Sequence, residues 1–593
     1  MSETISGLKR TKYCGEYRSS DIGSTVTCYG WVQKQRDKGS LIFIDLRDRT
    51  GVVQLVFDEK TEREVFEKAA SCRSEFVVAA VGVVRERSSK NPEIPTGDIE
   101  IEVTELRILN KAQTPPFEIV DGCKTAEEIR LKNRYLDLRR PELRDKIILR
   151  HKMMQETRKY MTEQGFLEIE TPMMIKSTPE GARDYIVPSR IHKGSFYALP
   201  QSPQLYKQLL MVAGMDRYFQ LARCFRDEDL RADRQPEFTQ LDMEMSFVEV
   251  EDVLAIGEGY IKRVYKEVLG IDVPTPFPRM TYNDAMNRFG SDKPDTRFGM
   301  EIQDLSETVK DVDFVVFKSA FENGGSVRAV VAKKATDIYT RKEIDRTTEF
   351  VKGIGAKGLA YIRWADEKPN CSFAKFLPEG KLDEIISVLG MEKGDVAFIV
   401  ADKDRIVLPT LGALRLDAGK KLGVIPFEQN NFLWIVEFPF FEYNDETGGW
   451  DAMHHPFTSP LDECIPYLFT DQGKVRAKCY DLVLNGIELC SGSIRITDPE
   501  LQNKMFEALG MTDEEAQAKF GFLLEAFKYG APPHGGMAIG VDRLCMLMTH
   551  AESLRDVVAF PKVKDASEPM TQAPTPVDDA QLKELGIAVI EAE

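Results

Sequence analysis

The stretch that decides the fold is Phe225-Arg-Asp-Glu-Asp-Leu-Arg-Ala-Asp-Arg-Gln-Pro-Glu-Phe-Thr-Gln240. Two strands joined by a charged loop are predicted, and because alternate strand residues share a side, Arg226 and Glu228 should point the same way. An arginine can donate two parallel hydrogen bonds to a phosphate and stays charged at physiological pH. Phe238 offers a flat ring on which a purine can stack. A solvated charged hairpin is the plainer alternative, but this density of arginine beside an aromatic residue favours an anion site.

A glycine-rich phrase near the C-terminal end, Gly535-Gly-Met-Ala-Ile-Gly-Val-Asp-Arg543, comes directly before an apolar helix. Glycines let a ligand approach the backbone closely, and Arg543 would lie on the first turn of that helix. The phrase lacks the Gly-Lys-Ser/Thr of a P-loop and is not a Rossmann G-x-G-x-x-G. A nucleotide bound here must therefore sit on another architecture.

A third phrase, Tyr480 to Leu489, is predicted to form a hairpin, because Asn485-Gly486 suits the left-handed dihedral angles of a type I′ turn. Asp481 and Glu488 supply the oxygen ligands that Mg²⁺ prefers when it also bridges phosphates. Arg495, further along the chain, can pair with a carboxylate. Each of these residues taken alone is more often a surface charge, so the prediction rests on their combination.

The N-terminal part has the pattern of a small β domain, running from about residue 21 to 108. Three strands, a charged amphipathic helix and two more strands is the order of a five-stranded OB barrel, a fold that often binds single-stranded nucleic acid. A generic small barrel is the alternative. The predicted strands are 25–32, 41–46, 52–57, 76–84 and 99–103, and the helix is 59–72.

The sequence pattern changes twice in the middle of the chain. A long helix is predicted from Pro141 to Gly165, followed by a strand, Phe166 to Pro172, whose proline places it at an edge or an interface. Residues 287–424 are richer in loops and glycine and carry no reactive cluster, so they are interpreted as an inserted domain. After about Pro561 the composition suggests a surface tail.

The composition indicates the general class of protein. The chain has 593 residues, 30% of them charged and 42% hydrophobic, which is typical of several globular domains and excludes a disordered or fibrous chain. The net charge of −17 argues against non-specific coating of nucleic acid. Ten scattered cysteines without a C-x-x-C pair predict free thiols. No signal peptide or membrane-length apolar run is evident, so a cytoplasmic protein without a membrane partner is expected.

The three phrases together resemble motifs 1, 2 and 3 of the class II aminoacyl-tRNA synthetases: Phe166–Pro172, Arg223–Glu244 and Gly535–Arg543. More narrowly, the chain resembles the bacterial-type aspartyl-tRNA synthetases of subclass b over nearly its full length. Further phrases in the order of that family support the resemblance: Thr178–Tyr185, Gln201–Lys207, Gly290–Arg297 and Ala452–Thr458.

The resemblance implies an α+β multidomain fold, with an N-terminal OB-fold β-barrel and a class II synthetase antiparallel-sheet catalytic domain that carries an inserted α+β domain. It also implies a homodimer built through the long helix and motif 1. The expected parts are an OB-fold anticodon-binding domain (1–110), a hinge (111–140), the first catalytic part with motifs 1 and 2 (141–286), the inserted domain (287–424), the second catalytic part with motif 3 (425–560) and a C-terminal extension (561–593).

The reaction implied by the resemblance is the ATP-dependent aspartylation of tRNA-Asp, through aspartyl-adenylate and pyrophosphate. Such a displacement needs positioning and charge neutralisation more than a protein base. By resemblance the catalytic residues are Arg226 and Arg543, with Arg226 on the α-phosphate and Arg543 on the outer phosphate. The expected ATP-binding residues are Arg226, Asp227, Glu228, Gln235, Phe238, Glu488, Gly540, Val541, Asp542 and Arg543, and those organising Mg²⁺ are Asp481, Glu488 and Ser491.

Aspartate must be told from its isosteric amide, and a buried lysine and arginine favour the charged ligand. Lys207 and Arg495 match the pair that does this in the family. Asparaginyl and lysyl synthetases share the barrel and the motifs, but Lys207 and the inserted domain weigh against both. The aspartate-binding residues carried over by resemblance are Glu180, Ser202, Gln204, Lys207, Arg226, Asp242, His454 and Arg495.

For tRNA, the resemblance implies that Phe43 stacks on an anticodon base, with Arg36, Gln54 and Glu100 reading neighbouring edges. A place for Phe43 in the barrel core is the alternative. Some relatives charge both tRNA-Asp and tRNA-Asn, and these relatives often carry histidine where this chain has Lys38. The absence of histidine at position 38 favours strict charging of tRNA-Asp. Lys38 also differs, however, from the leucine that is common in strict members. A non-catalytic tRNA-binding paralogue is the other alternative, but such proteins usually lose an arginine or carboxylate that is kept here.

Overall fold

The computed structural model describes residues 3–178, 180–229, 234–444 and 448–590, and the chain divides into two compact units. The first unit comprises Met1–Arg150 with Arg555–Thr575, and the second His151–Leu554 with Pro576–Glu593. Pro179 and residues 230–233, which belong to two of the quoted phrases, lie outside the described residues. Among the residues that are described, no helix is both long and apolar enough to cross a membrane. The six-part division of the chain stays a prediction.

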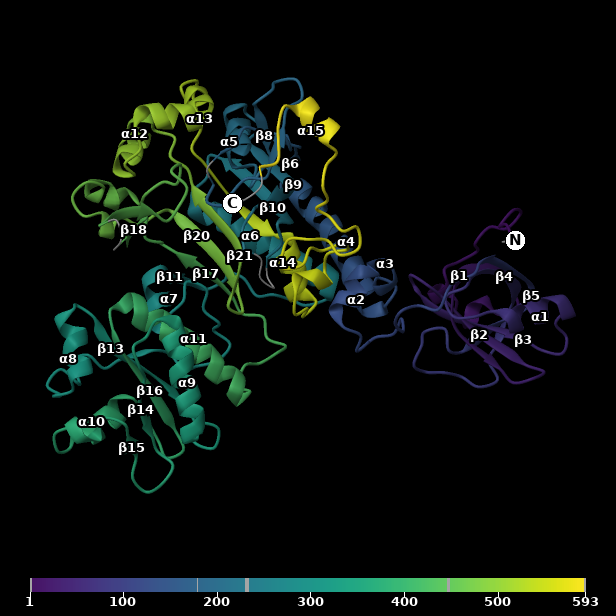
Figure 1. Ribbon diagram of the computed structural model, residues 1–593, viewed down its shortest axis with the longest axis horizontal. Coiled ribbons are helices and arrows are strands. Elements are labelled where there is room, and N and C mark those ends of the chain that lie inside the picture. Colours follow the sequence, from purple (N-terminus) through teal and green to yellow (C-terminus); the bar gives the residue numbers. More distant parts are fainter. Residues whose placement is uncertain (1–2, 179, 230–233, 445–447, 591–593) are drawn as a thin grey trace. The chain divides into compact units, whose positions relative to one another are not determined.

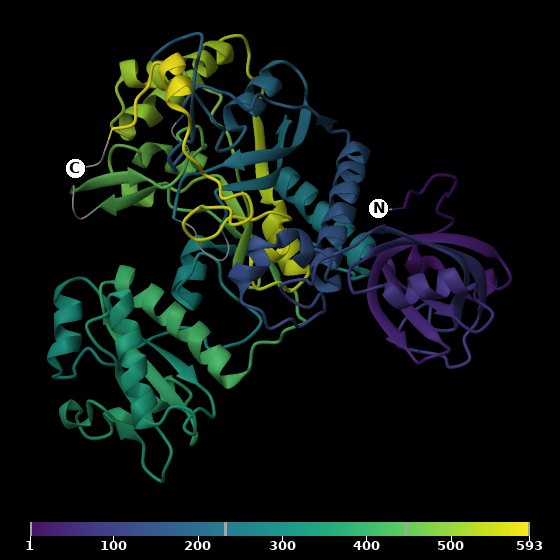
Figure 2. The same ribbon diagram turned by 45° about the vertical axis from the view of Figure 1, so that its right-hand side comes forward.

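Five strands of the first unit close into a barrel in the order β1-β2-β3-β5-β4, seen in purple in Figure 2. Only β3 and β5 pair in parallel. Three strands, a helix and two strands follow one another, which confirms the predicted order. The bounds are β1 (Thr25–Asp37), β2 (Ile42–Asp48), β3 (Gly51–Phe57), α1 (Arg63–Ser71), β4 (Val77–Glu86) and β5 (Ile99–Asn110).

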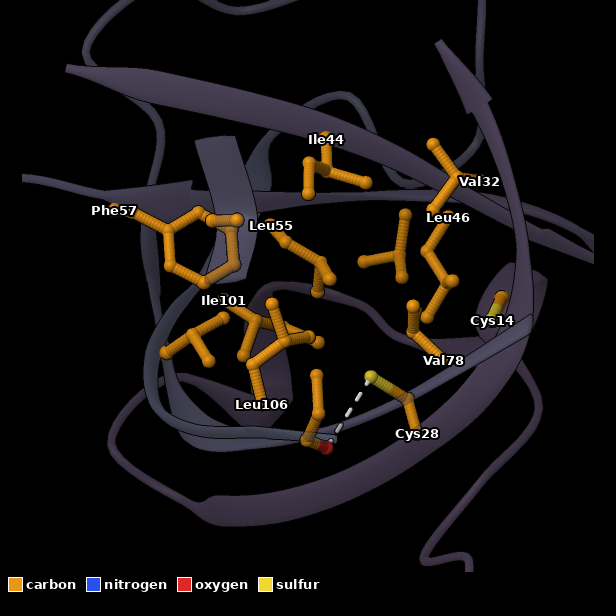
Figure 3. Close-up of a cluster of buried hydrophobic side chains, with 14 of the residues drawn as sticks. Cys14, Cys28, Val32, Ile44, Leu46, Leu55, Phe57, Val78, Ile101 and Leu106 are labelled. Atoms are coloured by element: carbon orange, nitrogen blue, oxygen red, sulfur yellow. Dashed lines mark hydrogen bonds between the residues drawn. The ribbon is translucent and has the colours of Figure 1, made fainter. Parts of the chain in front are cut away.

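The barrel core forms because alternate residues of each strand point inward. Ile44 and Leu46 of β2 are fully buried and lie in one cluster with Leu55 of β3 and Ile101 of β5 (Figure 3). Cys28 lies in the same cluster, with its Sγ 3.7 Å from the carbonyl oxygen of Ala80. All ten cysteines are free thiols, as the sequence predicted.

Helices follow the barrel: α2 (Glu127–Lys132), α3 (Arg134–Asp137) and α4 (Pro141–Glu163). Asp137 is completely buried and accepts hydrogen bonds from Arg134 at 2.9 Å and Arg140 at 2.7 Å. The long helix starts at the predicted proline, and Gly165 follows it with a φ of 80° that favours glycine.

The second unit is built on an eight-stranded sheet in the order β11-β17-β20-β21-β22-β10-β9-β6. Its six central strands are antiparallel, while the edge strands β11 and β6 pair in parallel with their neighbours. Strand β6 lies at the sheet edge, as predicted, but the predicted strand Phe166–Pro172 is shortened to Leu167–Glu168, so Pro172 lies outside it. The bounds are β6 (Leu167–Glu168), β9 (Arg217–Phe225), β10 (Glu237–Ser246), β11 (Arg279–Thr281), β17 (Phe432–Val436), β20 (Cys479–Leu484), β21 (Ile487–Ile494) and β22 (His534–Gly540).

Helices and two small hairpins surround this sheet. Phe457 and Leu205 of α5 pack with Phe506 of α12 and with Phe520 and Leu523 of α13 in one apolar cluster. The elements are α5 (Gln204–Val212), α6 (Val250–Val264), α7 (Tyr282–Phe289), α12 (Pro499–Ala508), α13 (Asp513–Phe527), α14 (Val541–Met548) and α15 (Asp579–Leu585), with hairpins β7 (Ile186–Pro188) to β8 (Phe196–Ala198) and β18 (Phe441–Asn444) to β19 (Gly449–Ala452).

The segment interpreted as an insertion has its own five-stranded sheet, β12-β13-β16-β14-β15, shown in teal and green in Figure 1. Apolar residues of α9 and α11 belong to one of its buried clusters and those of α8 and α10 to the other. The predicted mixture of strands and helices is therefore present. The bounds are β12 (Gln303–Asp304), α8 (Val315–Glu322), β13 (Ser326–Ala332), α9 (Arg341–Ile354), β14 (Ala360–Arg363), β15 (Asn370–Cys371), α10 (Lys381–Val388), β16 (Val396–Asp402) and α11 (Asp404–Leu422).

Candidate active site

The order of three strands brings the two arginines into one cleft. Strand β10 pairs with β9 on one side and with β22 on the other. Arg226 directly follows β9, and Arg543 lies on the first turn of α14 after β22, so both reach the same end of the sheet. They line one cavity of about 700 Å³. Arg543 donates a hydrogen bond of 2.6 Å to the carbonyl oxygen of Glu488, and the Arg226 guanidinium lies 5.0 Å from the centre of the Phe238 ring.

Most of the predicted site residues meet in this cavity, but three do not line it. Asp227 forms an ion pair of 3.5 Å with Arg183, Val541 is buried in the start of α14, and Asp481 lies on β20 directly opposite Ser491. The predicted residues that do line the cavity are Glu180, Ser202, Gln204, Lys207, Arg226, Glu228, Gln235, Phe238, Asp242, His454, Glu488, Ser491, Arg495, Gly540, Asp542 and Arg543.

Four buried charges lie at the floor of the cleft: Lys207, Asp242 and Arg495 line it, and Glu244 is buried behind them. Lys207 Nζ is 2.9 Å from Asp242 Oδ1 and 3.4 Å from Glu244 Oε2. Arg495 pairs with Glu244 through two hydrogen bonds of 2.9 and 3.1 Å. Each of the four side chains is at most 6% exposed, so the two cations and two carboxylates balance one another away from water. Burial raises the pKa of Asp242 against the pull of Lys207, whereas Arg495 and Lys207 together outweigh burial and lower the pKa of Glu244.

A glycine makes room for this network. Gly536 of β22 lies between Glu244 of β10 and Ser493 of β21 in the strand register. A Cβ at this position would lie 2.2 Å from Glu244 Oε2 and 2.1 Å from the carbonyl oxygen of Met243. Glu244 can therefore reach Arg495 across β22 only because that strand carries no side chain here.

A loop brings Glu180 over the cleft. Ser202 donates a hydrogen bond of 2.5 Å to Glu180 Oε2. The side chain of Gln201 fixes the loop, because it accepts from the backbone N–H of Ala182 at 3.1 Å and donates to the carbonyl oxygen of the same residue at 2.8 Å. Burial raises the pKa of Glu180 to about 7, although Ser202 and Arg226 favour its ionised form. Glu180 therefore changes charge near neutral pH.

Two histidines border the cleft in their neutral form. Burial lowers the pKa of His454 to about 4, and burial together with Arg495 lowers the pKa of His455 to about 3. The Nε2 atom of each is buried and has no hydrogen-bond partner in the part of the chain that the structure describes. Both rings are therefore free to make a polar contact with a bound molecule.

Two carboxylates and a serine fit the role of a magnesium site. Asp481 Oδ1 is buried without a hydrogen-bond partner among the described residues. Burial raises the pKa of Asp481 well above its usual value, and the charge of Glu488 raises it further. A bound cation would stabilise the charged form of two such neighbouring carboxylates. The described residues hold no group of three His, Cys, Asp or Glu side chains arranged for a metal ion. The protein thus supplies two carboxylates, in keeping with a Mg²⁺ ion that is otherwise held by water and phosphate oxygens.

Sequence reasoning gave no role to several residues that line or support the cleft. Glu244 was within the quoted motif, and its place two residues after Asp242 on one strand was a usable signal. His455 stands beside His454, and Gln201 opens a phrase that was recognised. Lys293 belongs to a quoted phrase, but only the tertiary structure brings it to the cleft.

A second cavity, of about 440 Å³, lies on the barrel and collects all four predicted anticodon residues, Arg36, Phe43, Gln54 and Glu100. Gln54 donates to Glu100 at 2.7 Å and accepts from Arg36 at 3.0 Å. Phe43 is half-buried on the outer face between the inward-pointing Ile42 and Ile44, so it is not part of the core. Lys38 also lines this cavity and is exposed.

Comparisons with known proteins agree with this geometry. Residues 126–564 match the family model described as tRNA synthetases class II (D, K and N), and residues 26–109 match that of the OB-fold nucleic acid binding domain. Among solved structures, asparaginyl-tRNA synthetase from Pyrococcus horikoshii superimposes with a TM-score of 0.58 at 18% identity, covering 93% of this chain and 98% of the other. Aspartyl-tRNA synthetase from Entamoeba histolytica gives 0.57 at 20% identity, covering 94% and 92%. The fold and the cleft are those of a class II tRNA synthetase.

Relatives that match over their full length identify the family within the class II tRNA synthetases. The chain is 57% identical to the "Aspartate--tRNA(Asp/Asn) ligase" of Lachnoclostridium phytofermentans, over 99% of each chain. It is also 57% identical to the "Aspartate--tRNA ligase" of Ruminiclostridium cellulolyticum, over 99% of this chain and 100% of the relative. The chain belongs to the aspartate–tRNA ligase family. This relationship confirms the enzyme interpretation over the asparaginyl, lysyl and non-catalytic alternatives.

Proposed function

We propose that the cleft activates L-aspartate with ATP and that the aspartyl group then passes to the terminal adenosine of tRNA-Asp. In the first step an α-carboxylate oxygen of aspartate bonds to the α-phosphorus of ATP, and the bond from that phosphorus to the bridging oxygen breaks to release pyrophosphate. In the second step a ribose hydroxyl oxygen attacks the activated carbonyl carbon, releasing AMP and the hydroxyl proton. The observation that carries the proposal is the meeting of Arg226 and Arg543 with Lys207, Asp242 and Arg495 in one cavity.

Arg226 and Arg543 neutralise the triphosphate. Arg226 holds the α-phosphate and the attacking carboxylate, where charge accumulates, and Arg543 holds the outer phosphate. Phe238 stacks on the adenine, and Glu228 accepts from its edge. The first step needs no protein base at the reacting atoms, because an ionised carboxylate is already the nucleophile.

Lys207 and Arg495 select aspartate through its side-chain carboxylate. Both cations are buried and already oppose two carboxylates, so the substrate carboxylate meets a fixed, water-poor pair of donors. An amide in the same place could not use either charge, which disfavours asparagine. Asp242, Gln204, Ser202 and Glu180 address the substrate ammonium, with His454 beside them.

Asp481, Glu488 and Ser491 would hold Mg²⁺, which supplies charge neutralisation of the phosphates when bound. The orphaned Asp481 oxygen supports this assignment. The barrel cavity would read the anticodon, with Phe43 as the stacking platform.

We also propose a homodimer. Apolar side chains are exposed on β6, in the segment after it and on the β7–β8 hairpin, including Leu167 at 51%, Met174 at 58%, Ile186 at 60% and Phe196 at 45%. Such a concentration is typical of an interface. The free thiols favour a reducing compartment, and we place the reaction in the cytoplasm.

A wider tRNA specificity is the second candidate, because relatives at 57% and 56% identity carry the name Asp/Asn ligase. Charging of purified tRNA-Asp and tRNA-Asn transcripts side by side decides between them. Strict charging gives product with tRNA-Asp alone. Comparable rates on both transcripts would support the wider specificity, and the absence of aspartate-dependent ATP–pyrophosphate exchange would contradict the proposed activation step.

A further inference from the structure

Lys293 reaches the cleft from a loop that has no role in the proposed reaction so far. Its phrase, Gly290-Ser-Asp-Lys-Pro-Asp-Thr-Arg297, runs between α7 and the segment with the second sheet. Lys293 lines the cleft with Glu488 and Arg543. Its Nζ lies 3.9 Å from Glu488 Oε2 and 3.5 Å from Asp292 Oδ1, both too long for a firm hydrogen bond. The ammonium therefore keeps hydrogen-bonding capacity at the end of the cleft that Glu488 lines.

Arg415 of α11 fixes this loop. Its guanidinium donates to three loop carbonyl oxygens, those of Gly299 at 3.0 Å, Asp295 at 2.8 Å and Phe298 at 2.7 Å. The same group lies 4.0 Å from the centre of the Phe298 ring and 4.9 Å from that of Phe289. Arg415 is only 1% exposed, and burial lowers its pKa to about 10, which still leaves it charged at neutral pH.

Close backbone contacts hold the loop from two sides. A Cβ on Gly290 would lie 2.0 Å from the carbonyl oxygen of Leu408 on α11, and a Cβ on Gly412 would lie 2.6 Å from the carbonyl oxygen of Gly290. At the other end, a Cβ on Gly486 would lie 3.2 Å from Asp295 Cβ. The loop is therefore clamped between α11 and the turn of the β20–β21 hairpin that carries the magnesium carboxylates.

We propose that Lys293 binds the β- and γ-phosphates of ATP, which leave as pyrophosphate, and that Arg415 is a positioning residue that holds Lys293 there. The inference rests on the proposed place of ATP in this cleft. An ammonium is a compact charge with three donors and suits phosphate oxygens. Lys293 also offsets the charge of Asp481 and Glu488, and on this proposal its cation lies where the leaving group gathers negative charge. The segment with the second sheet thus contributes to catalysis through its helix α11.

The first test is Lys293→Ala, with Lys293→Arg as the conservative variant. The matched control is Arg288→Ala, which removes a cation from α7 that pairs with Glu301 and does not line the cleft. The measurements are the KM values for ATP and aspartate in exchange, and the KM for pyrophosphate when preformed enzyme-bound aspartyl-adenylate is converted back to ATP. Lys293→Ala should raise the KM for pyrophosphate roughly tenfold or more, the effect of losing a hydrogen bond to a charged group. The KM for aspartate should stay within about twofold, and Lys293→Arg should recover part of the loss.

The second test concerns Arg415. Arg415→Gln should weaken pyrophosphate binding in the same direction as Lys293→Ala, and the double variant should be no worse than Lys293→Ala alone, because both act through one group. Thermal unfolding identifies a folding defect, and Arg415→Lys then serves as the milder variant. An unchanged KM for pyrophosphate in Lys293→Ala would overturn the inference while leaving the exchange activity of the wild type, and so the proposed function, intact. Equal losses for aspartate and pyrophosphate in the Arg415 variants would overturn its positioning role.

Discussion

The side chain of Lys207 is fully buried. Replacing Lys207 by methionine removes its positive charge while keeping most of its volume. A substrate carboxylate about 4 Å from this ammonium gains about 4 kcal/mol at an effective dielectric constant of about 20. Each 1.36 kcal/mol is a factor of ten in rate, so kcat/KM for aspartate should fall about 10³-fold. The amide of asparagine carries no charge, so its much lower kcat/KM should change little and discrimination should largely disappear.

The assay for Lys207→Met is amino-acid-dependent ATP–pyrophosphate exchange with aspartate and asparagine in parallel, with the KM for ATP as the internal control. The loss of Lys207 also leaves Asp242 buried without the cation that lies 2.9 Å away, and breaking a buried pair costs about 3–5 kcal/mol of stability. The variant Lys207→Met with Asp242→Asn should recover part of the melting temperature but not the aspartate activity. A Lys207→Met enzyme that keeps wild-type preference for aspartate over asparagine would refute the reasoning.

Two further predictions concern the loop over the cleft and the barrel. The pKa of Glu180 is about 7, so the carboxylate that pairs with the substrate ammonium is present above that pH and lost below it; the KM for aspartate should rise by up to tenfold per unit as pH falls below 7. Glu180→Gln should flatten this profile, and an unchanged slope would assign the titration to another group such as Asp242. Phe43→Ala should raise the KM for tRNA-Asp by about 5- to 150-fold, the range expected for one lost stacking contact of about 1–3 kcal/mol. The same variant should leave exchange without tRNA unchanged, and a normal KM for tRNA-Asp would count against Phe43 as a stacking platform.

Local patterns predicted the elements well where chain geometry alone sets them. The Asn485-Gly486 turn has φ values of 54° and 86°, as a type I′ turn requires. Gly165 ends the long helix, and the order of strands and helix in the barrel follows from alternation and turn residues. Strand ends were less well predicted: β1 runs five residues past the predicted Val32, because pairing with β2 continues to Asp37.

The site was predictable only in part from the sequence. The motifs supplied residues such as Arg226 and Lys207, because they stand within long and specific phrases. The pairing of Glu244 with Arg495 across β22, at Gly536, could not be predicted. It depends on the register of three strands that are far apart in sequence. The arrival of Lys293 depends on the packing of α11 against its loop, and no local pattern encodes that contact.

The central claim is that guanidinium groups at 226 and 543 act on one triphosphate. Single-turnover formation of aspartyl-adenylate by Arg226→Ala and Arg543→Ala tests it most directly, with tRNA-Asp binding as the control for folding. Both variants should lose at least about 10²-fold in the rate of adenylate formation, while the affinity for tRNA-Asp stays close to that of the wild type. Adenylate formation at nearly the wild-type rate by either variant would contradict the account.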